Sequence, residues 1–111
     1  MQVGVKAMSP REFCARWPDE DRANVQLLDV REPAEIAIAA LPDAIPIPMR
    51  EIPARLHELD LHRPVVVMCH SGIRSGHVAA FLLANGFEQV FNLAGGIDAW
   101  SVDVDPTLPR Y

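Results

Sequence analysis

The sequence from Val65 to Gly76 reads Val-Val-Val-Met-Cys-His-Ser-Gly-Ile-Arg-Ser-Gly. Its apolar, β-branched start is typical of a strand buried on both faces. The strand ends at Cys69, and a helical pattern runs from about Ser75 to Asn85. A tight loop that leads into a helix N-terminus gathers backbone N–H groups and the positive end of the helix dipole in one place. The pattern therefore predicts a loop that stabilises negative charge on the sulfur of Cys69.

Cys69 has the surroundings expected of a reactive thiolate, with Arg74 five positions further along. A helix N-terminus alone contributes about 0.3–1 kcal/mol, which is less than the roughly 1.36 kcal/mol that corresponds to one pKa unit. Lowering the pKa of a thiol from about 8.5 to below 7 therefore needs the guanidinium of Arg74 and the loop N–H groups as well. We interpret Cys69 as a nucleophile. The alternative is a small hydrophobic residue at the end of a strand, which is the usual role of a free cysteine.

The composition indicates one globular domain. The 111 residues are 50% hydrophobic and 23% charged, which suits a chain that buries a core without disulfides or metals. No apolar run approaches the roughly 18 residues of a membrane span, and the start lacks the features of a signal peptide. With two cysteines, we expect a cytoplasmic protein without a disulfide and without a membrane partner. A net charge of −5 argues against nucleic acid, whereas a locally positive loop could still bind a small anion.

Short strands and helices alternate along the chain. We expect strands at Val3–Ala7, Val25–Val30, Ala44–Ile47, Val65–Met68 and Val90–Leu93. We expect helices at about residues 9–16, 32–38, 49–59, 75–85 and 97–100. This alternation predicts an α/β fold with a central, mainly parallel five-stranded sheet and helices on both faces. We treat residues 1–111 as a single domain with a core at about 5–105 and an irregular, proline-punctuated tail from Val102 to Tyr111.

A second pair of candidate residues follows the strand expected beside the Cys69 strand. Asp29 lies near the end of the strand expected at residues 25–30, and Arg31 follows that strand. Ligands of parallel sheets bind beyond the carboxyl ends of the strands. In a functional interpretation, Asp29 fixes Arg74 or a loop amide, and Arg31 attracts anions. In a structural interpretation, the two residues form an ion pair or a helix cap, which is the more common use of such pairs.

Four segments together resemble the rhodanese family of sulfurtransferases. They are Leu27-Leu28-Asp29-Val30-Arg31-Glu32, Ala44-Ile45-Pro46-Ile47-Pro48, Cys69-His70-Ser71-Gly72-Ile73-Arg74-Ser75 and Asn92-Leu93-Ala94-Gly95-Gly96-Ile97-Asp98-Ala99-Trp100. Any one of these segments is weak evidence. All four follow the order and spacing of the family over about residues 5–105, so the resemblance covers nearly the whole chain and implies a rhodanese-like fold.

The resemblance implies a thiosulfate sulfurtransferase that works through a persulfide on Cys69. The donor would be a small sulfur-containing anion such as thiosulfate, and the acceptor would be cyanide, a low-molecular-weight thiol or a protein. The persulfide would be held by the loop residues His70, Ser71, Gly72, Ile73, Arg74 and Ser75. Within this loop, the hydroxyls of Ser71 and Ser75 would add hydrogen bonds, and Arg74 would bind the sulfonate end of the donor. The family implies no metal and no organic cofactor.

The sequence departs from the family pattern at three positions. Ala40 and Asp43 stand where many members have a histidine and a glycine, and we expect local packing to change there more than chemistry. His70 follows the cysteine where an arginine is common. This exchange would weaken affinity for anionic thiosulfate and favour another donor.

The remaining cysteine and histidines are assigned structural or surface roles. Cys14 lies beside Phe13 and Trp17 and is interpreted as a packing residue, because free cysteines are usually buried and inert. A resolving partner for Cys69 is the alternative. The scattered histidines are expected at the surface, and they are His57, His62 and His77. Cys69, His70 and His77 lack the ligand spacing of a metal site.

Three other functions compete with small-molecule sulfur transfer. A phosphatase or arsenate reductase of the related fold would have five residues between its cysteine and arginine, whereas Cys69 and Arg74 are separated by four. A persulfide relay that docks to a sulfur-carrier or E1-like partner is a second rival, because residues 95–111 resemble rhodanese domains fused to E1-like adenylating enzymes. A non-enzymatic rhodanese-like interaction module is the third, and such modules commonly lack the cysteine.

Overall fold

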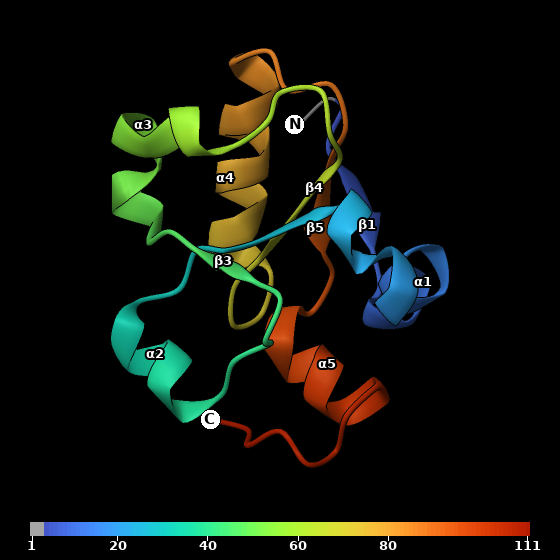
Figure 1. Ribbon diagram of the computed structural model, residues 1–111. Helices are drawn as coiled ribbons and strands as arrows, with labels where there is room; N and C mark the ends of the chain where they lie inside the picture. The colour runs from blue at the N-terminus through green and yellow to red at the C-terminus, as the bar shows by residue number, and fades with distance from the viewer. Residues whose placement is uncertain (1–3) are drawn as a thin grey trace.

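Five strands form one sheet in the order β1-β5-β4-β2-β3, and every neighbouring pair is parallel (Figure 1). This computed structural model describes residues 4–111. The strands are β1 (Lys6–Met8), β2 (Gln26–Asp29), β3 (Ile45–Pro46), β4 (Val65–Met68) and β5 (Val90–Leu93). The predicted α/β fold with a five-stranded parallel sheet is therefore confirmed. β4 occupies the middle of the sheet, and the two short strands β1 and β3 form its edges.

Helices cover both faces of the sheet, as the alternation of elements predicted. The core between the sheet and α1 (Pro10–Arg16) and α5 (Gly96–Asp103) fills one face. The core beneath α3 (Ile52–Arg55) and α4 (Ile73–Ala84) fills the other (Figure 1). α2 (Pro33–Ile38) follows β2, and three 3₁₀ helices complete the chain at Asp19–Asn24, Met49–Glu51 and Leu56–Glu58. In the part of the chain that the structure describes, no helix is long and apolar enough to cross a membrane.

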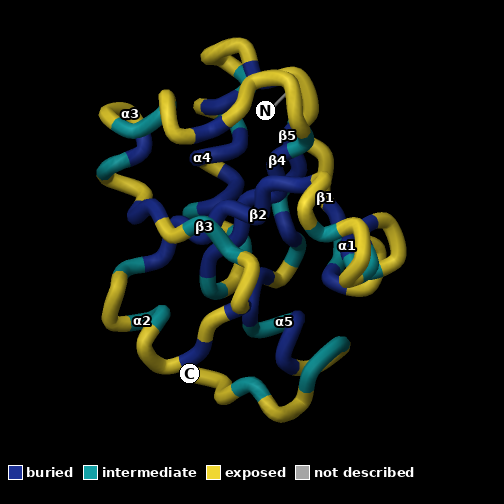
Figure 2. Tube along the Cα trace, in the orientation of Figure 1, coloured by how far each residue is buried: buried dark blue, intermediate teal, exposed yellow. Residues whose placement is uncertain are grey.

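The alternation of side chains along β4 brings Cys69 to one face of the sheet. Val65 and Val67 lie in the core beneath α4 together with Cys69, whereas Val66 and Met68 lie in the core beneath α1 and α5. All four residues of β4 are completely buried, as the dark blue centre of Figure 2 shows. A parallel strand buried on both faces reads as a continuous apolar run, which is why residues 65–68 could be assigned from the sequence.

Several element boundaries differ from the sequence predictions. α4 begins at Ile73 instead of Ser75, because Gly72 adopts a left-handed conformation with φ of +106° and turns the chain directly into the helix. The helix expected at residues 49–59 is divided into three short pieces. The first break falls just before Pro53, which has no N–H to continue the hydrogen-bond ladder from the preceding turn. The first strand begins at Lys6, and Val3 lies outside the described residues.

Candidate active site

Backbone and side-chain donors surround the sulfur of Cys69 at the carboxyl end of β4. The Gly72 N–H donates to Sγ at 3.1 Å, and the Ser75 N–H donates at 3.4 Å. The Ser75 hydroxyl lies 3.3 Å from the same atom. The left-handed Gly72, which a glycine adopts without steric cost, lets the chain fold back over the sulfur. Cys69 is only 1% exposed, so a reactant reaches its sulfur by entering the loop.

These contacts favour the thiolate form of Cys69. Burial raises the pKa of the thiol, but the hydrogen bonds outweigh burial and hold the pKa below its usual value. They come from the Ser75 side chain and amide and from the amides of Gly72 and Ser71. N–H groups that point at a sulfur lie where negative charge develops when the thiol ionises. The structure thus places a buried cysteine with a lowered thiol pKa at the end of the central strand.

The Ser75 hydroxyl has two partners and a single proton. It donates to Asn92 Oδ1 at 2.6 Å, and Asn92 is held in this orientation because its Nδ2 donates to the carbonyl of Gly72 at 3.0 Å. A hydroxyl can donate only one hydrogen bond at a time. Either Sγ or Ser75 Oγ can be the donor between these two atoms, and a hydrogen bond from the hydroxyl to a thiolate would replace its bond to Asn92. Asn92 was not singled out for this role from the sequence.

The N-terminus of α5 supports the loop from behind. The Ile97 N–H donates to the carbonyl of Cys69 at 3.0 Å, and the Asp98 N–H donates to the carbonyl of His70 at 3.1 Å. Gly96, with φ of +60°, lies so close that a Cβ atom there would be 2.3 Å from the Cys69 carbonyl oxygen. The Gly95-Gly96 pair therefore allows the N-terminus of α5 to lie directly against the loop.

Arg74 is held by a residue that the sequence analysis did not select. Its two Nη atoms donate to the carboxylate of Glu35 at 2.7 and 2.9 Å. Glu35 Oε1 also accepts the N–H of Glu32 at 3.1 Å in the capping box of α2. The hydrogen bonds from Arg74 lower the pKa of Glu35 to about 2 despite partial burial. Glu35 in turn raises the pKa of Arg74, and the thiolate of Cys69 adds to this effect.

Asp29 and Arg31 form a buried ion pair. Arg31 Nη2 donates to Asp29 Oδ2 at 2.7 Å, and the two side chains are 0% and 2% exposed. Other N–H groups of Arg31 donate to the carbonyls of Ala39 and Glu35. Burial lowers the pKa of Arg31, but its hydrogen bonds to Asp29 and Tyr111 outweigh burial, so the pKa is raised. The geometry is that of the structural ion pair, since Asp29 contacts Arg31 and the guanidinium of Arg31 lies away from solvent.

The tail reaches the loop through Tyr111. Its ring stacks on the ring of His70, with centroids 4.1 Å apart and planes inclined by 14°. Its hydroxyl donates to Glu35 Oε2 at 2.8 Å and accepts from Arg31 Nη1 at 3.1 Å. The sequence predicted an irregular tail and assigned no role to Tyr111. Nothing in the local pattern of a proline-punctuated segment indicates which distant residue it contacts.

The other candidate residues lie at the surface or in the core. Ser71 and Ile73 are exposed on the loop, and Ile73 is 72% exposed. Cys14 packs beside the core under α1, and burial raises the pKa of its thiol. The remaining residues discussed from the sequence are all exposed, and they are His57, His62, His77, Ala40 and Asp43. Within residues 4–111, no group of three or more histidine, cysteine, aspartate or glutamate side chains is arranged to hold a metal ion.

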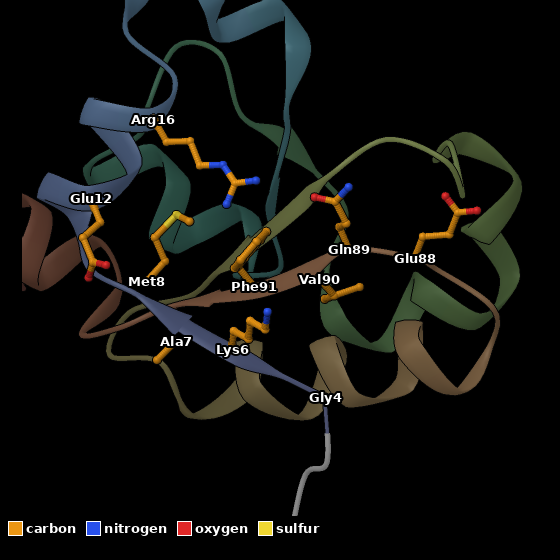
Figure 3. A pocket seen from close by; sticks show the side chains of 10 residues that line it. All are labelled: Gly4, Lys6, Ala7, Met8, Glu12, Arg16, Glu88, Gln89, Val90 and Phe91. Carbon is orange, nitrogen blue, oxygen red and sulfur yellow. The ribbon is translucent and has the colours of Figure 1, made fainter.

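A cavity of about 440 Å³ lies at the opposite end of the sheet from Cys69. Figure 3 shows Lys6, Arg16 and Val90 among the residues around it, between α1 and the amino ends of β1 and β5. None of its lining residues belongs to the loop after β4. Because ligands of parallel sheets bind beyond the carboxyl ends of the strands, the loop remains the candidate active site.

Comparisons with known proteins give the family. The model of the rhodanese-like domain matches residues 17–103. The chain is 47% identical over 81 residues to a sulfurtransferase of Allochromatium vinosum, covering 73% of this chain and 76% of the relative. It is 35% identical over 74 residues to the thiosulfate sulfurtransferase GlpE of Pseudomonas syringae, covering 67% and 70%.

A solved structure gives the same result for the fold. The rhodanese-like domain protein of Staphylococcus aureus superposes with a TM-score of 0.80 at 31% identity, over 96% of this chain and 99% of that one. The parallel sheet with a cysteine loop after its central strand thus defines a rhodanese-like α/β domain. The chain belongs to the rhodanese-like domain family.

Proposed function

We propose that the protein is a sulfurtransferase in which Cys69 carries a sulfane sulfur from a small donor anion such as thiosulfate to a thiophilic acceptor. The observation that carries this proposal is the position of Sγ, which receives the N–H groups of Gly72 and Ser75 at 3.1 and 3.4 Å. These donors favour the thiolate needed for attack, and they can equally hold the anionic terminal sulfur of a persulfide. The sulfurtransferases of Allochromatium vinosum and Pseudomonas syringae support the same reaction class.

The reaction proceeds in two displacements. The Cys69 thiolate attacks the sulfane sulfur of thiosulfate, a new S–S bond forms at Sγ, and the bond to the sulfonate sulfur breaks. Sulfite leaves with the electron pair, and Cys69 carries a persulfide anion. Cyanide or a thiolate then attacks the outer sulfur, which departs as thiocyanate or as a new persulfide and regenerates the Cys69 thiolate. Atoms and charge balance in both steps without a further reactant.

Arg74 is suited to bind the sulfonate of the donor while it remains paired. A guanidinium has five N–H donors, and the bidentate contact with Glu35 uses two of them. The Arg74 side chain is 32% exposed, so a small anion can reach it. Glu35 offsets part of the positive charge and at the same time fixes the orientation of the guanidinium.

Intact-mass spectrometry tests this proposal. Thiosulfate should add one sulfur atom to the protein, and cyanide should remove it with the formation of thiocyanate. Cys69→Ser should abolish both changes, whereas the matched variant Cys14→Ser should retain them. An adduct that depends on Cys14 and not on Cys69 would overturn the assignment.

Transfer to a protein acceptor is the second candidate function. Ile73 is 72% exposed directly on the loop, and Met49 and Phe81 are also exposed apolar residues. Exposed apolar side chains beside a reactive group are typical of a surface that contacts another protein. Rapid loading by thiosulfate followed by very slow discharge to cyanide and to small thiols would favour this relay over small-molecule transfer.

A further inference from the structure

The tail after α5 is fastened to the site at several points. We define residues 105–111 as the strap. The Ser101 hydroxyl donates to the carbonyl of Leu108 at 2.6 Å, and Leu108 packs against the core beneath α1 and α5. Arg110 donates to both carboxylate oxygens of Asp98, at 2.8 and 3.0 Å. Figure 1 shows the strap running from α5 to the neighbourhood of α2, so Tyr111 is brought to the loop by specific contacts.

Tyr111 links the two ends of the loop. Its ring stacks on His70, the residue that follows Cys69, at a centroid distance of 4.1 Å. Its hydroxyl donates to Glu35 at 2.8 Å, and Glu35 binds Arg74, near the other end of the loop, at 2.7 and 2.9 Å. The contacts therefore form a closed ring from His70 through Tyr111, Glu35 and Arg74 and back along the loop.

The ring of Tyr111 is held in place from two directions. Arg31 donates to the Tyr111 hydroxyl at 3.1 Å, and Arg31 is itself buried and fixed by Asp29. One face of the aromatic ring stacks on the His70 side chain, whose Nε2 is buried and has no hydrogen-bond partner among residues 4–111. The stack holds the aromatic ring beside the loop, and the contacts of the hydroxyl add to this restraint.

We propose that Tyr111 is a specificity-determining residue. It forms a steric wall on the His70 side of the loop, so that small reactants reach Cys69 faster than bulky ones. The inference rests on the proposed function where it concerns sulfur transfer. Because Cys69 is buried at the bottom of the loop, each reactant has to pass the groups at its rim. Tyr111 is 37% exposed and stacks on the residue that follows Cys69, so truncating it removes bulk beside the loop without removing a donor to Sγ.

Alkylation of Cys69 tests the wall without requiring sulfur transfer. The rates of modification by iodoacetamide and by a bulky N-arylmaleimide are followed at the Cys69 peptide by mass spectrometry, which separates this site from Cys14. Tyr111→Ala should raise the maleimide-to-iodoacetamide rate ratio severalfold. Tyr111→Phe keeps the stacked ring, so its maleimide-to-iodoacetamide rate ratio should be close to that of the unmodified protein. Leu61→Ala, which truncates another exposed apolar residue, should leave the ratio unchanged.

A single-turnover experiment applies the same test to the proposed reaction. Each protein is loaded with thiosulfate, and discharge of the persulfide to cyanide and to glutathione is timed. Tyr111→Ala should accelerate discharge to glutathione severalfold relative to cyanide, and Tyr111→Phe should restore the original preference. The steric role of Tyr111 is disproved if Tyr111→Ala leaves both the alkylation ratio and the discharge ratio unchanged. It is also disproved if Tyr111→Phe shifts these ratios as far as Tyr111→Ala does. Failure to load the unmodified protein would overturn the proposed function instead, and the alkylation ratio would still decide the role of Tyr111.

Discussion

Glu35 and Arg74 are joined by two parallel hydrogen bonds of 2.7 and 2.9 Å, although 39 positions separate them in the sequence. The pair connects α2 to the first turn of α4 and keeps the arginine of the loop in one orientation. Glu35 uses both carboxylate oxygens in this contact and still accepts from Tyr111 and from the N–H of Glu32. A single carboxylate therefore links α2, α4 and the strap.

Glu35→Gln should destabilise the protein at neutral pH and have less effect in acid. The pKa of Glu35 is lowered to about 2 in the folded protein, so its stabilisation is complete above the unfolded value of about 4.3 and is lost as the pH falls through about 2. At neutral pH we expect a loss of about 2 kcal/mol after allowance for solvent screening. Glutamine can retain the capping box. Urea unfolding between pH 7 and pH 2 measures the difference, and a difference that does not shrink in acid would contradict the ion-pair explanation.

Ser75→Ala should raise the pKa of Cys69. In the thiolate form, the Ser75 hydroxyl can turn its proton to the sulfur, and the variant loses this donor while it keeps the backbone N–H groups. The rate of iodoacetamide modification against pH gives the pKa, and the unmodified protein should titrate below the usual value of about 8.5. Ser9→Ala removes a hydroxyl that caps α1 and is not a partner of the sulfur, and it serves as the control. Equal pKa values in all three proteins would show that the hydroxyl does not assist ionisation.

Asp29→Asn should destabilise the protein far more than the loss of a surface pair. The variant leaves the guanidinium of Arg31 buried without its counter-charge, and breaking a buried pair in this way costs roughly 3–5 kcal/mol. Arg50→Ala is the matched comparison, because Arg50 pairs with Glu32 at the surface and such a pair contributes about 0–1 kcal/mol. Thermal unfolding of both variants makes the comparison. Similar losses would mean that the burial of Arg31 is not what makes the pair important.

Gly96→Ala should disturb the loop as well as the fold. Gly96 and Gly86 both have positive φ, but a Cβ at Gly96 would overlap the Cys69 carbonyl, whereas a Cβ at Gly86 would meet none of residues 4–111 within 4 Å. Gly86→Ala should therefore cost about 1–2 kcal/mol from backbone strain alone. Gly96→Ala should cost roughly 3 kcal/mol or more and should slow alkylation of Cys69. Unfolding and alkylation rates test both effects, and equal behaviour of the two variants would exclude the steric argument.

The protein should not hydrolyse aryl phosphates above background. Only four residues separate Cys69 from Arg74, and in the structure the Gly72 and Ser75 amides already approach the sulfur closely. A transferring phosphoryl group needs room for its oxygens among these donors. Release of nitrophenol from p-nitrophenyl phosphate is the assay, with Cys69→Ser as control. Robust turnover that depends on Cys69 would overturn the sulfurtransferase proposal.

The sequence was sufficient for the elements whose signals are local. The valine run of β4 indicates a buried strand. Ser9 and Glu12 form a capping box at the start of α1, and Pro33 suits the first position of α2. All three elements, expected at residues 65–68, 9–16 and 32–38, are present. Ile52, Leu56 and Leu59 keep helical spacing across residues 49–59, so this pattern alone predicts one helix and does not show the breaks around Pro53. The early start of α4 was missed because the left-handed conformation of Gly72 depends on the fold of the loop.

The candidate site was predictable only in part, for a similar reason. Cys69 and the loop after it are contiguous in the sequence, so their arrangement follows from a strand, a turn and a helix. Glu35, Asn92 and Tyr111 come from three other elements, and only the folded chain brings them to the loop. A glutamate at the third position of a helix is explained fully by its capping box, and nothing local indicates that Glu35 also binds an arginine.

The attachment of Cys69 to the middle strand has a consequence for local unfolding. Segments of a protein open with different free energies, and central strands generally open last, together with the whole molecule. β4 has a hydrogen-bonded neighbour on each side and is completely buried, so its amide hydrogens should exchange with solvent only through global opening. Fraying of the edge strands β1 and β3 would leave the backbone on which the sulfur is mounted intact. Cys69 therefore keeps its position relative to the sheet for as long as the domain remains folded.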